Sequence, residues 1–96
     1  MVEVAILRHP GWPTVTVSVR FFAGARAAAG LDEEKLTLVA PATVATLVSE
    51  LSQRCGTDLA RVLASSSYIV DEVAATAERP LQDGARVDVL PPFAGG

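Results

Sequence analysis

The sequence predicts an α+β domain built on a mixed β-sheet with a helix packed on one face. Apolar and polar residues alternate in residues 14–22, 34–39 and 86–90, as expected of half-buried strands. Between these strands, residues 44–51 carry apolar side chains at the spacing of a helix. The resulting order (strand, strand, helix, helix, strand, strand) sets the helices between two groups of strands, which is typical of this fold class.

Length and composition describe one small domain. The chain has 96 residues, of which 50% are hydrophobic and 20% are charged. A chain of this size buries only about two-thirds of the surface that its unfolded form exposes, so a deep enclosed active site is hard to build. We therefore expect a function carried out at the surface. Residues 1–13 are predicted to be an N-terminal extension, either an edge strand or disordered, residues 14–90 the folded domain, and residues 91–96 a C-terminal tail.

Charge and cysteine content exclude several classes of partner. Eight Lys and Arg against eleven Asp and Glu give a net charge of −3, the wrong sign for binding a phosphate backbone, so we expect no nucleic acid partner. Cys55 is the single cysteine and cannot form an internal disulfide, whereas small secreted domains are usually rich in disulfides. The first residues lack a basic leader and no window is long enough to span a membrane, so we expect a cytoplasmic protein without membrane contact.

The first two predicted strands form an antiparallel hairpin with a long connection. Residues 25–29 are rich in alanine and allow one or two helical turns that end at Gly30. Residues 32–34 are expected to form a solvated turn, and residues 34–39 then supply the second strand. The apolar residues that face the core from the two strands are predicted to be Val15, Val17, Val19, Phe21, Leu36 and Leu38.

Two helices are predicted after Pro41. Thr43 is a suitable N-cap for the first helix, and Gly56 suits its end. The apolar residues of this helix recur at i, i+3, i+4 and i+7, namely Val44, Leu47, Val48 and Leu51. Thr57 and Asp58 are predicted to cap a second, short helix. Its narrower apolar stripe consists of Leu59, Val62 and Leu63.

The remaining strands lie in the last third of the chain. Residues 68–70 are aromatic and β-branched, which favours a strand, and Asp71–Glu72 is expected to turn the chain at its end. Residues 80–84 form a cluster of turn-favouring residues. The last strand is predicted to bury Val87 and Val89.

The residue set lacks a conventional active site. His9 lies in a turn rich in Pro and Gly without a second His or a nearby Cys, so we expect no metal site. Cys55 is expected at the C-terminal end of a helix, where the dipole disfavours a thiolate nucleophile. The glycines form neither a P-loop nor a dinucleotide-binding fingerprint. We therefore expect that this chain binds no cofactor and is not an enzyme on its own.

The C-terminal residues carry the strongest functional signal. Pro91 and Pro92 lack backbone N–H groups and have a fixed φ, so they end the last strand and direct the following residues away from the domain. Gly95 and Gly96 have no Cβ and could pass through a channel too narrow for other residues. A carboxylate at the tip, once activated by transfer of AMP from ATP, could accept sulfur and become a thiocarboxylate. The alternative is a frayed terminus that happens to be rich in glycine.

Three segments together carry a resemblance to a known family. They are residues 17–23 (VSVRFFA), residues 80–84 (PLQDG) and residues 91–96 (PPFAGG). With the order of elements over residues 15–96, they resemble the ubiquitin-like β-grasp sulfur carriers, and most closely the small subunit of molybdopterin synthase. The Pro-Pro-x-x-Gly-Gly ending is similar to the molybdopterin branch, because carriers for thiamin and cysteine biosynthesis usually lack both prolines.

The resemblance implies a β-grasp fold and a cycle with three partners. An adenylating enzyme would activate Gly96 with ATP, and a sulfur donor would convert it to a thiocarboxylate. The large subunit of molybdopterin synthase would then use this sulfur to build the dithiolene of molybdopterin from cyclic pyranopterin monophosphate. Gly96 would bear the sulfur, and Gly95 would keep the channel passable. The candidate partner-binding residues are Phe22, Leu90, Pro91, Pro92, Phe93, Ala94 and Gly95.

Several departures and alternatives accompany this resemblance. The 13-residue extension is atypical, Asp71–Glu72 stands where the family often has Asn-Gly, and Phe93 is bulkier than the usual valine. Phe22 faces a partner in one interpretation and belongs to the core in the other. The competing functions are a sulfur carrier for cysteine or thiamin biosynthesis, a ubiquitin-like modifier joined through Gly96 to lysines, and an interaction module with an inert tail.

Overall fold

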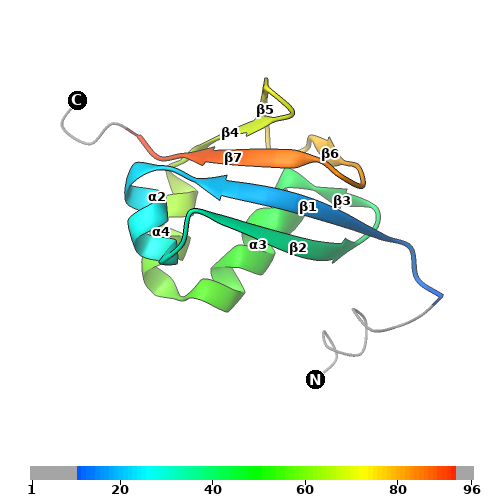
Figure 1. The fold of residues 1–96 in the computed structure, drawn as a ribbon, viewed down its shortest axis with the longest axis horizontal. Coiled ribbons are helices and arrows are strands. Elements are labelled where there is room, and N and C mark those ends of the chain that lie inside the picture. The colour runs from blue at the N-terminus through cyan, green and yellow to red at the C-terminus, as the bar shows by residue number, and fades with distance from the viewer. Residues whose placement is uncertain (1–10, 93–96) are drawn as a thin grey trace.

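The structure, a computed structural model, describes residues 11–92 and has a five-stranded sheet at its centre (Figure 1). The strands are ordered β2-β1-β7-β4-β5 across this sheet. Their bounds are β1 Thr14–Phe21, β2 Glu33–Val39, β4 Ser67–Val70, β5 Val73–Ala75 and β7 Arg86–Leu90. A second, two-stranded sheet joins β3 (Ala42–Thr43) to β6 (Pro80–Leu81). The helices within residues 11–92 are α2 (Ala23–Ala29), α3 (Val44–Cys55) and α4 (Thr57–Ala64). What was predicted for residues 1–10 and 93–96 lies outside the described residues.

The sheet is mixed, and the helices cover one of its faces (Figure 1). β1 pairs antiparallel with β2 and parallel with β7, and β4 pairs antiparallel with β7 and with β5. The parallel pair joins the beginning of the described chain to its end, because Ser18 to Phe21 lie beside Arg86 to Val89. The predicted α+β class is therefore confirmed.

The core forms between the helices and the inner face of the sheet. The alternation predicted on β1, β2 and β7 is confirmed, since each strand buries every second side chain. Val17, Val19, Leu47, Val87 and Val89 have no exposed surface. All buried side chains of the described residues are apolar. Burial of apolar surface is thus the main source of stability in this domain.

The two longer helices begin in different ways. Thr43 caps α3 as predicted, because its hydroxyl accepts a hydrogen bond from the Thr46 N–H and the Thr46 hydroxyl accepts one from the Thr43 N–H. The predicted cap of α4 by Thr57 or Asp58 is wrong. α3 ends at Cys55, so Gly56 alone separates the helices and takes the N-cap position of α4 without a side-chain hydrogen bond.

Some short strands were not predicted because apolar and polar residues do not alternate in their sequences. β5 consists of Val73, Ala74 and Ala75, and it forms because the turn at Asp71–Glu72 folds it back onto β4. The predicted turn at residues 32–34 is too long by two residues, since Glu33 and Glu34 already pair with β1. Residues 80–84 hold the short strand β6 before the turn itself. These differences arise from strand pairing and leave the fold class unchanged.

Truncating Leu47 to Ala is expected to lower the free energy of unfolding by about 2–4 kcal/mol, because it leaves a cavity between α3 and the sheet. Val48 is only partly buried on the same helix, so Val48→Ala is the matched control with a smaller loss. Denaturant unfolding followed by circular dichroism measures both. Equal losses for the two variants would contradict the assigned inner face of α3.

Thr43→Ala is expected to cost about 1 kcal/mol because it removes the capping box of α3. Thr57→Ala at the start of α4 should be close to neutral, since that helix has no side-chain cap. Thermal unfolding of the two variants gives the comparison. A loss at Thr57 as large as the loss at Thr43 would show that Thr57 does cap α4.

Candidate functional site: a docking surface at the base of the tail

Within the described part of the chain, the side chains that commonly bind metal ions do not cluster. No group of three His, Cys, Asp or Glu side chains lies close enough to hold a metal ion within residues 11–92. In the same range, no helix has the length and apolar character needed to cross a membrane. The Ser66 hydroxyl donates a hydrogen bond to the carbonyl of Val62, and this bond satisfies a carbonyl in the last turn of α4.

The parallel pairing of β1 and β7 brings their C-terminal ends side by side (Figure 1). Phe21 lies opposite Val89, and the Phe22 N–H donates a hydrogen bond to the Val89 carbonyl at 3.3 Å. Phe21 and Val89 are buried, so the next residues, Phe22 and Leu90, fall on the outer face of the sheet. Pro91 and Pro92 follow Leu90 directly at this point.

Phe22 is exposed and does not belong to the core. Its exposed fraction is 39%, against 2% for Phe21, so the interpretation of Phe22 as a core residue is wrong. The guanidinium carbon of Arg20 lies 5.4 Å from the centre of the Phe22 ring, within the range of a cation–π interaction. Ala23 has a φ of 50°, a conformation that favours glycine, and this residue turns the chain from β1 into α2 directly after Phe22.

An apolar hollow of about 490 Å³ surrounds Phe22 and the end of β7. Ile69 on β4 faces outward there, because it pairs with Asp88 of β7 and Ala74 of β5, while its neighbour Val70 is buried. We refer to this surface as the tail-root patch. Its residues are Phe22, Ile69, Ala74, Leu90, Pro91 and Pro92, and the lining of the hollow also includes Ala23, Ser67 and Tyr68.

The predicted site residues divide into two groups. Phe22, Leu90, Pro91 and Pro92 come together in the tail-root patch, as expected of a partner-binding surface. Phe93, Ala94, Gly95 and Gly96 lie outside the described residues, so their assignment stays a prediction.

Sequence reasoning missed two members of the patch, Ile69 and Ala74. Ile69 could have been found, because a strand that buries Val70 must direct Ile69 to the opposite face. Ala74 could not have been found, since its place depends on the pairing of β5 with β4.

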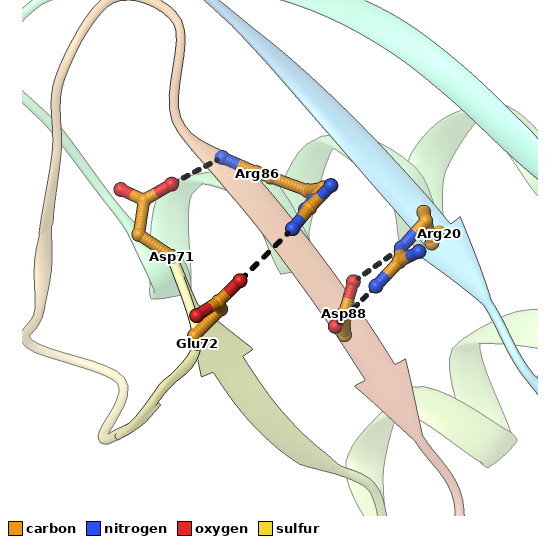
Figure 2. Close-up of polar contacts among 5 residues, drawn as sticks. All are labelled: Arg20, Asp71, Glu72, Arg86 and Asp88. Atoms are coloured by element: carbon orange, nitrogen blue, oxygen red, sulfur yellow. Dashed lines mark hydrogen bonds and ion pairs between the residues drawn. The ribbon is translucent and has the colours of Figure 1, made fainter.

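Beyond the patch, the outer face of the sheet is charged (Figure 2). Arg20 and Asp88 form a two-pronged ion pair, and the Arg86 guanidinium lies 3.6 Å from the Glu72 carboxylate. The Asp71 carboxylate accepts a hydrogen bond from the Arg86 N–H at 3.0 Å. The hydrogen bond that Arg20 donates to the Asp88 carboxylate raises the pKa of Arg20 above its ordinary value. The outer face thus has an apolar half at the base of the tail and a charged half farther from it.

Tyr68 has a structural role beside the patch. Its hydroxyl donates a hydrogen bond to the Leu63 carbonyl at 2.7 Å, and burial raises its pKa to about 12. A phenol with this pKa stays protonated at neutral pH and keeps its hydrogen bond to α4. A second hollow of about 690 Å³ lies on the other side of Tyr68, between α3, α4 and β5. Ser67, Tyr68 and Ala74 line both this hollow and the apolar hollow at the tail-root patch.

The described surface is suited to binding a protein partner. An exposed aromatic ring, aliphatic side chains and two prolines form one continuous apolar area, and such areas commonly mark interaction sites. Ser67 and Tyr68 also line the hollow, and the Tyr68 hydroxyl is hydrogen-bonded to the Leu63 carbonyl. The surface can therefore hold a protein partner next to Pro91 and Pro92.

Comparison with known proteins agrees with this arrangement. The model of the ThiS family matches residues 19–96, which includes both the tail-root patch and the tail. Among curated proteins, none matches the sequence.

Many solved structures match this chain in shape, and three of them illustrate the likeness. A candidate molybdopterin converting factor, subunit 1, from Pyrococcus furiosus is 27% identical, with a TM-score of 0.70 and coverage of 82% of this chain and 99% of that one. Subunit 1 in the complex of subunits 1 and 2 of molybdopterin-converting factor from Helicobacter pylori is 25% identical, with a TM-score of 0.59 and coverage of 85% and 100%. Small archaeal modifier protein 1 (SAMP1) from Methanosarcina acetivorans is 22% identical and shows the fold alone, with a TM-score of 0.74 and coverage of 88% and 99%.

The resemblance expected from the three sequence segments is confirmed by these matches. The fold they share is the ubiquitin-like β-grasp, in which a β-hairpin and a helix are followed by strands that complete a mixed sheet. Since the family model covers most of the sequence, this chain belongs to the ThiS family of ubiquitin-like sulfur carriers.

Proposed function

We propose that this chain is the small, sulfur-carrying subunit of a molybdopterin synthase. The observation that carries the proposal is the tail-root patch, which lies on the outer face of the sheet where β7 leads into the Pro-Pro-x-x-Gly-Gly tail. A partner that covers this patch is placed directly beside the tail. Its own active site can then receive Gly96 while the β-grasp domain stays outside.

The proposed chemistry takes place on the C-terminal carboxylate of Gly96. One carboxylate oxygen attacks the α-phosphorus of ATP in an adenylating enzyme, which forms an acyl adenylate and releases pyrophosphate. Sulfide supplied by a sulfur donor then attacks the carbonyl carbon, so that a C–S bond forms, the C–O bond to the phosphate of AMP breaks, AMP leaves, and a thiocarboxylate remains after loss of the sulfide proton. The thiocarboxylate sulfur is the nucleophile that the large synthase subunit would use on cyclic pyranopterin monophosphate to build the dithiolene.

Two matches support the molybdopterin branch over other sulfur acceptors. The Pyrococcus furiosus and Helicobacter pylori proteins both carry the name of molybdopterin-converting factor, and the latter structure contains subunits 1 and 2 together. The two prolines at the start of the tail, Pro91 and Pro92, favour the same branch. A carrier for thiamin or cysteine biosynthesis is distinguished by the large partner that co-purifies with the chain.

A second candidate function is a protein modifier joined through Gly96 to lysines. The observation in its favour is the fold shared with SAMP1 from Methanosarcina acetivorans, whose name describes a modifier. Gly96 found in isopeptide linkage on cell proteins would support this function. Only free and thiocarboxylated chains in the cell would exclude it.

Deletion of Gly95 and Gly96 is expected to abolish sulfur loading and leave the melting temperature unchanged. The reason is that the deletion removes the carboxylate from its place at the end of the tail, whereas the core lies within residues 14–90. Intact-mass spectrometry after incubation with ATP, the adenylating enzyme and a sulfur donor measures loading as the replacement of one oxygen by sulfur. Loading of the truncated chain at the wild-type rate would exclude Gly96 as the carrier group.

Phe22→Ala is expected to weaken binding of the adenylating enzyme or the large subunit about 10-fold or more, with little change in melting temperature, because the ring is an exposed anchor. Phe21→Ala is the matched control on the adjacent, buried ring and should cost about 3–5 kcal/mol of stability. Titration calorimetry and thermal unfolding separate the two effects. Wild-type affinity in Phe22→Ala would remove the tail-root patch from the partner interface.

A further inference from the structure

We propose that Arg20 and Asp88 are a positioning pair that holds the Phe22 ring ready for the partner at the border of the tail-root patch. The inference rests on the proposed function, in which a partner docks on this patch. Neither side chain was singled out by sequence, because their meeting depends on the pairing of two strands from opposite ends of the domain. Figure 2 shows the two side chains facing each other across β1 and β7.

The pair has a geometry that limits its motion. Arg20 Nε donates to one carboxylate oxygen of Asp88 at 2.8 Å, and Nη2 donates to the other at 3.0 Å. Two parallel hydrogen bonds between a planar guanidinium and a planar carboxylate fix the orientation of both groups. The two residues are also direct neighbours in the strand register, so the backbone holds them at this spacing.

The fixed guanidinium lies against Phe22. Arg20 and Phe22 are two residues apart and share the outer face, and the guanidinium carbon is 5.4 Å from the ring centre. A guanidinium held by Asp88 presents a constant surface to the ring, whereas a free one would sample many rotamers. Phe22 therefore keeps one orientation before the partner arrives, and less conformational entropy is lost on binding.

The pair also suits the border of an apolar interface. Asp88 is already largely covered, with 16% of its side chain exposed, against 38% for Arg20. Its strand neighbour on β4 is Ile69, a member of the tail-root patch. A partner that covers the patch would remove more water from Asp88, and a carboxylate that keeps its guanidinium partner tolerates this loss far better than an unpaired one. Arg20 thus both orients Phe22 and neutralises the charge beside the patch.

The test compares three variants in the full chain. Asp88→Asn removes the charge that fixes the guanidinium, and Arg20→Lys keeps the positive charge without the planar fork. The double variant Arg20→Asp/Asp88→Arg restores an ion pair between the same strands but moves the guanidinium to β7, away from Phe22. If the ion pair is purely structural, the exchanged pair should restore both the stability of the domain and its binding to the partner. If the pair positions Phe22, the exchange should restore stability but not partner binding.

The first readout is NMR of the chain without a partner. In the wild type, the side-chain protons of Arg20 are expected to show an upfield ring-current shift from Phe22, and this shift should be lost in Asp88→Asn. An unchanged shift in Asp88→Asn would overturn the positioning role. This readout needs no sulfur chemistry, so it stands apart from the proposed function.

The second readout is ATP–pyrophosphate exchange by the adenylating enzyme that activates the wild-type chain. We expect the KM for the carrier to rise about 3- to 10-fold in all three variants with kcat unchanged, since the tail itself is intact. Recovery of the wild-type KM by the exchanged pair would show a structural role and overturn the proposal. Failure of the wild-type chain to become thiocarboxylated would instead overturn the proposed function, while the NMR shift still decides the role of Asp88.

Discussion

The parallel pairing of β1 with β7 is the constraint on which the rest of the structure depends. It joins strands from opposite ends of the domain, and Val19 and Val87, which lie opposite each other in this pair, are both fully buried. On the inner face the pairing completes the core under the helices. On the outer face it sets Arg20 beside Asp88 and brings Phe22 to the end of β7. Stability and the docking surface therefore arise from the same contact.

The two faces of the sheet have different roles: the inner face forms the core, and the outer face carries the exposed side chains. Period-2 alternation sends valines and leucines inward, which leaves the outer positions free to carry other side chains without loss of the core. Those outer positions form the apolar tail-root patch and, beyond it, a charged area. Figure 2 shows five side chains of the charged area. A domain of this size has little volume for an internal site, so a surface that binds a partner suits it better than an enclosed pocket.

Much of the fold was predictable because its signals are local. The apolar residues of α3 recur at helical spacing, Thr43 caps that helix, and Gly30 ends α2 with a φ of 81°. By contrast, β5 and the pair of β3 with β6 form only because other strands position them, and their short sequences show no alternation. The cap of α4 was mispredicted for a related reason, since the single residue between the helices left that position to Gly56.

For the candidate site, the sequence by itself determined the conformational properties of the residues that make up the tail. Prolines that end a strand and glycines without a Cβ act through their own covalent structure, whatever the surrounding fold. The sequence also pointed to Phe22 and Leu90 but left the orientation of Phe22 open. Only the tertiary structure decided that orientation, joined Ile69 to the patch and brought Arg20 to Asp88. Each of these depends on strand register, because register brings together side chains that are distant in sequence and determines which face they share.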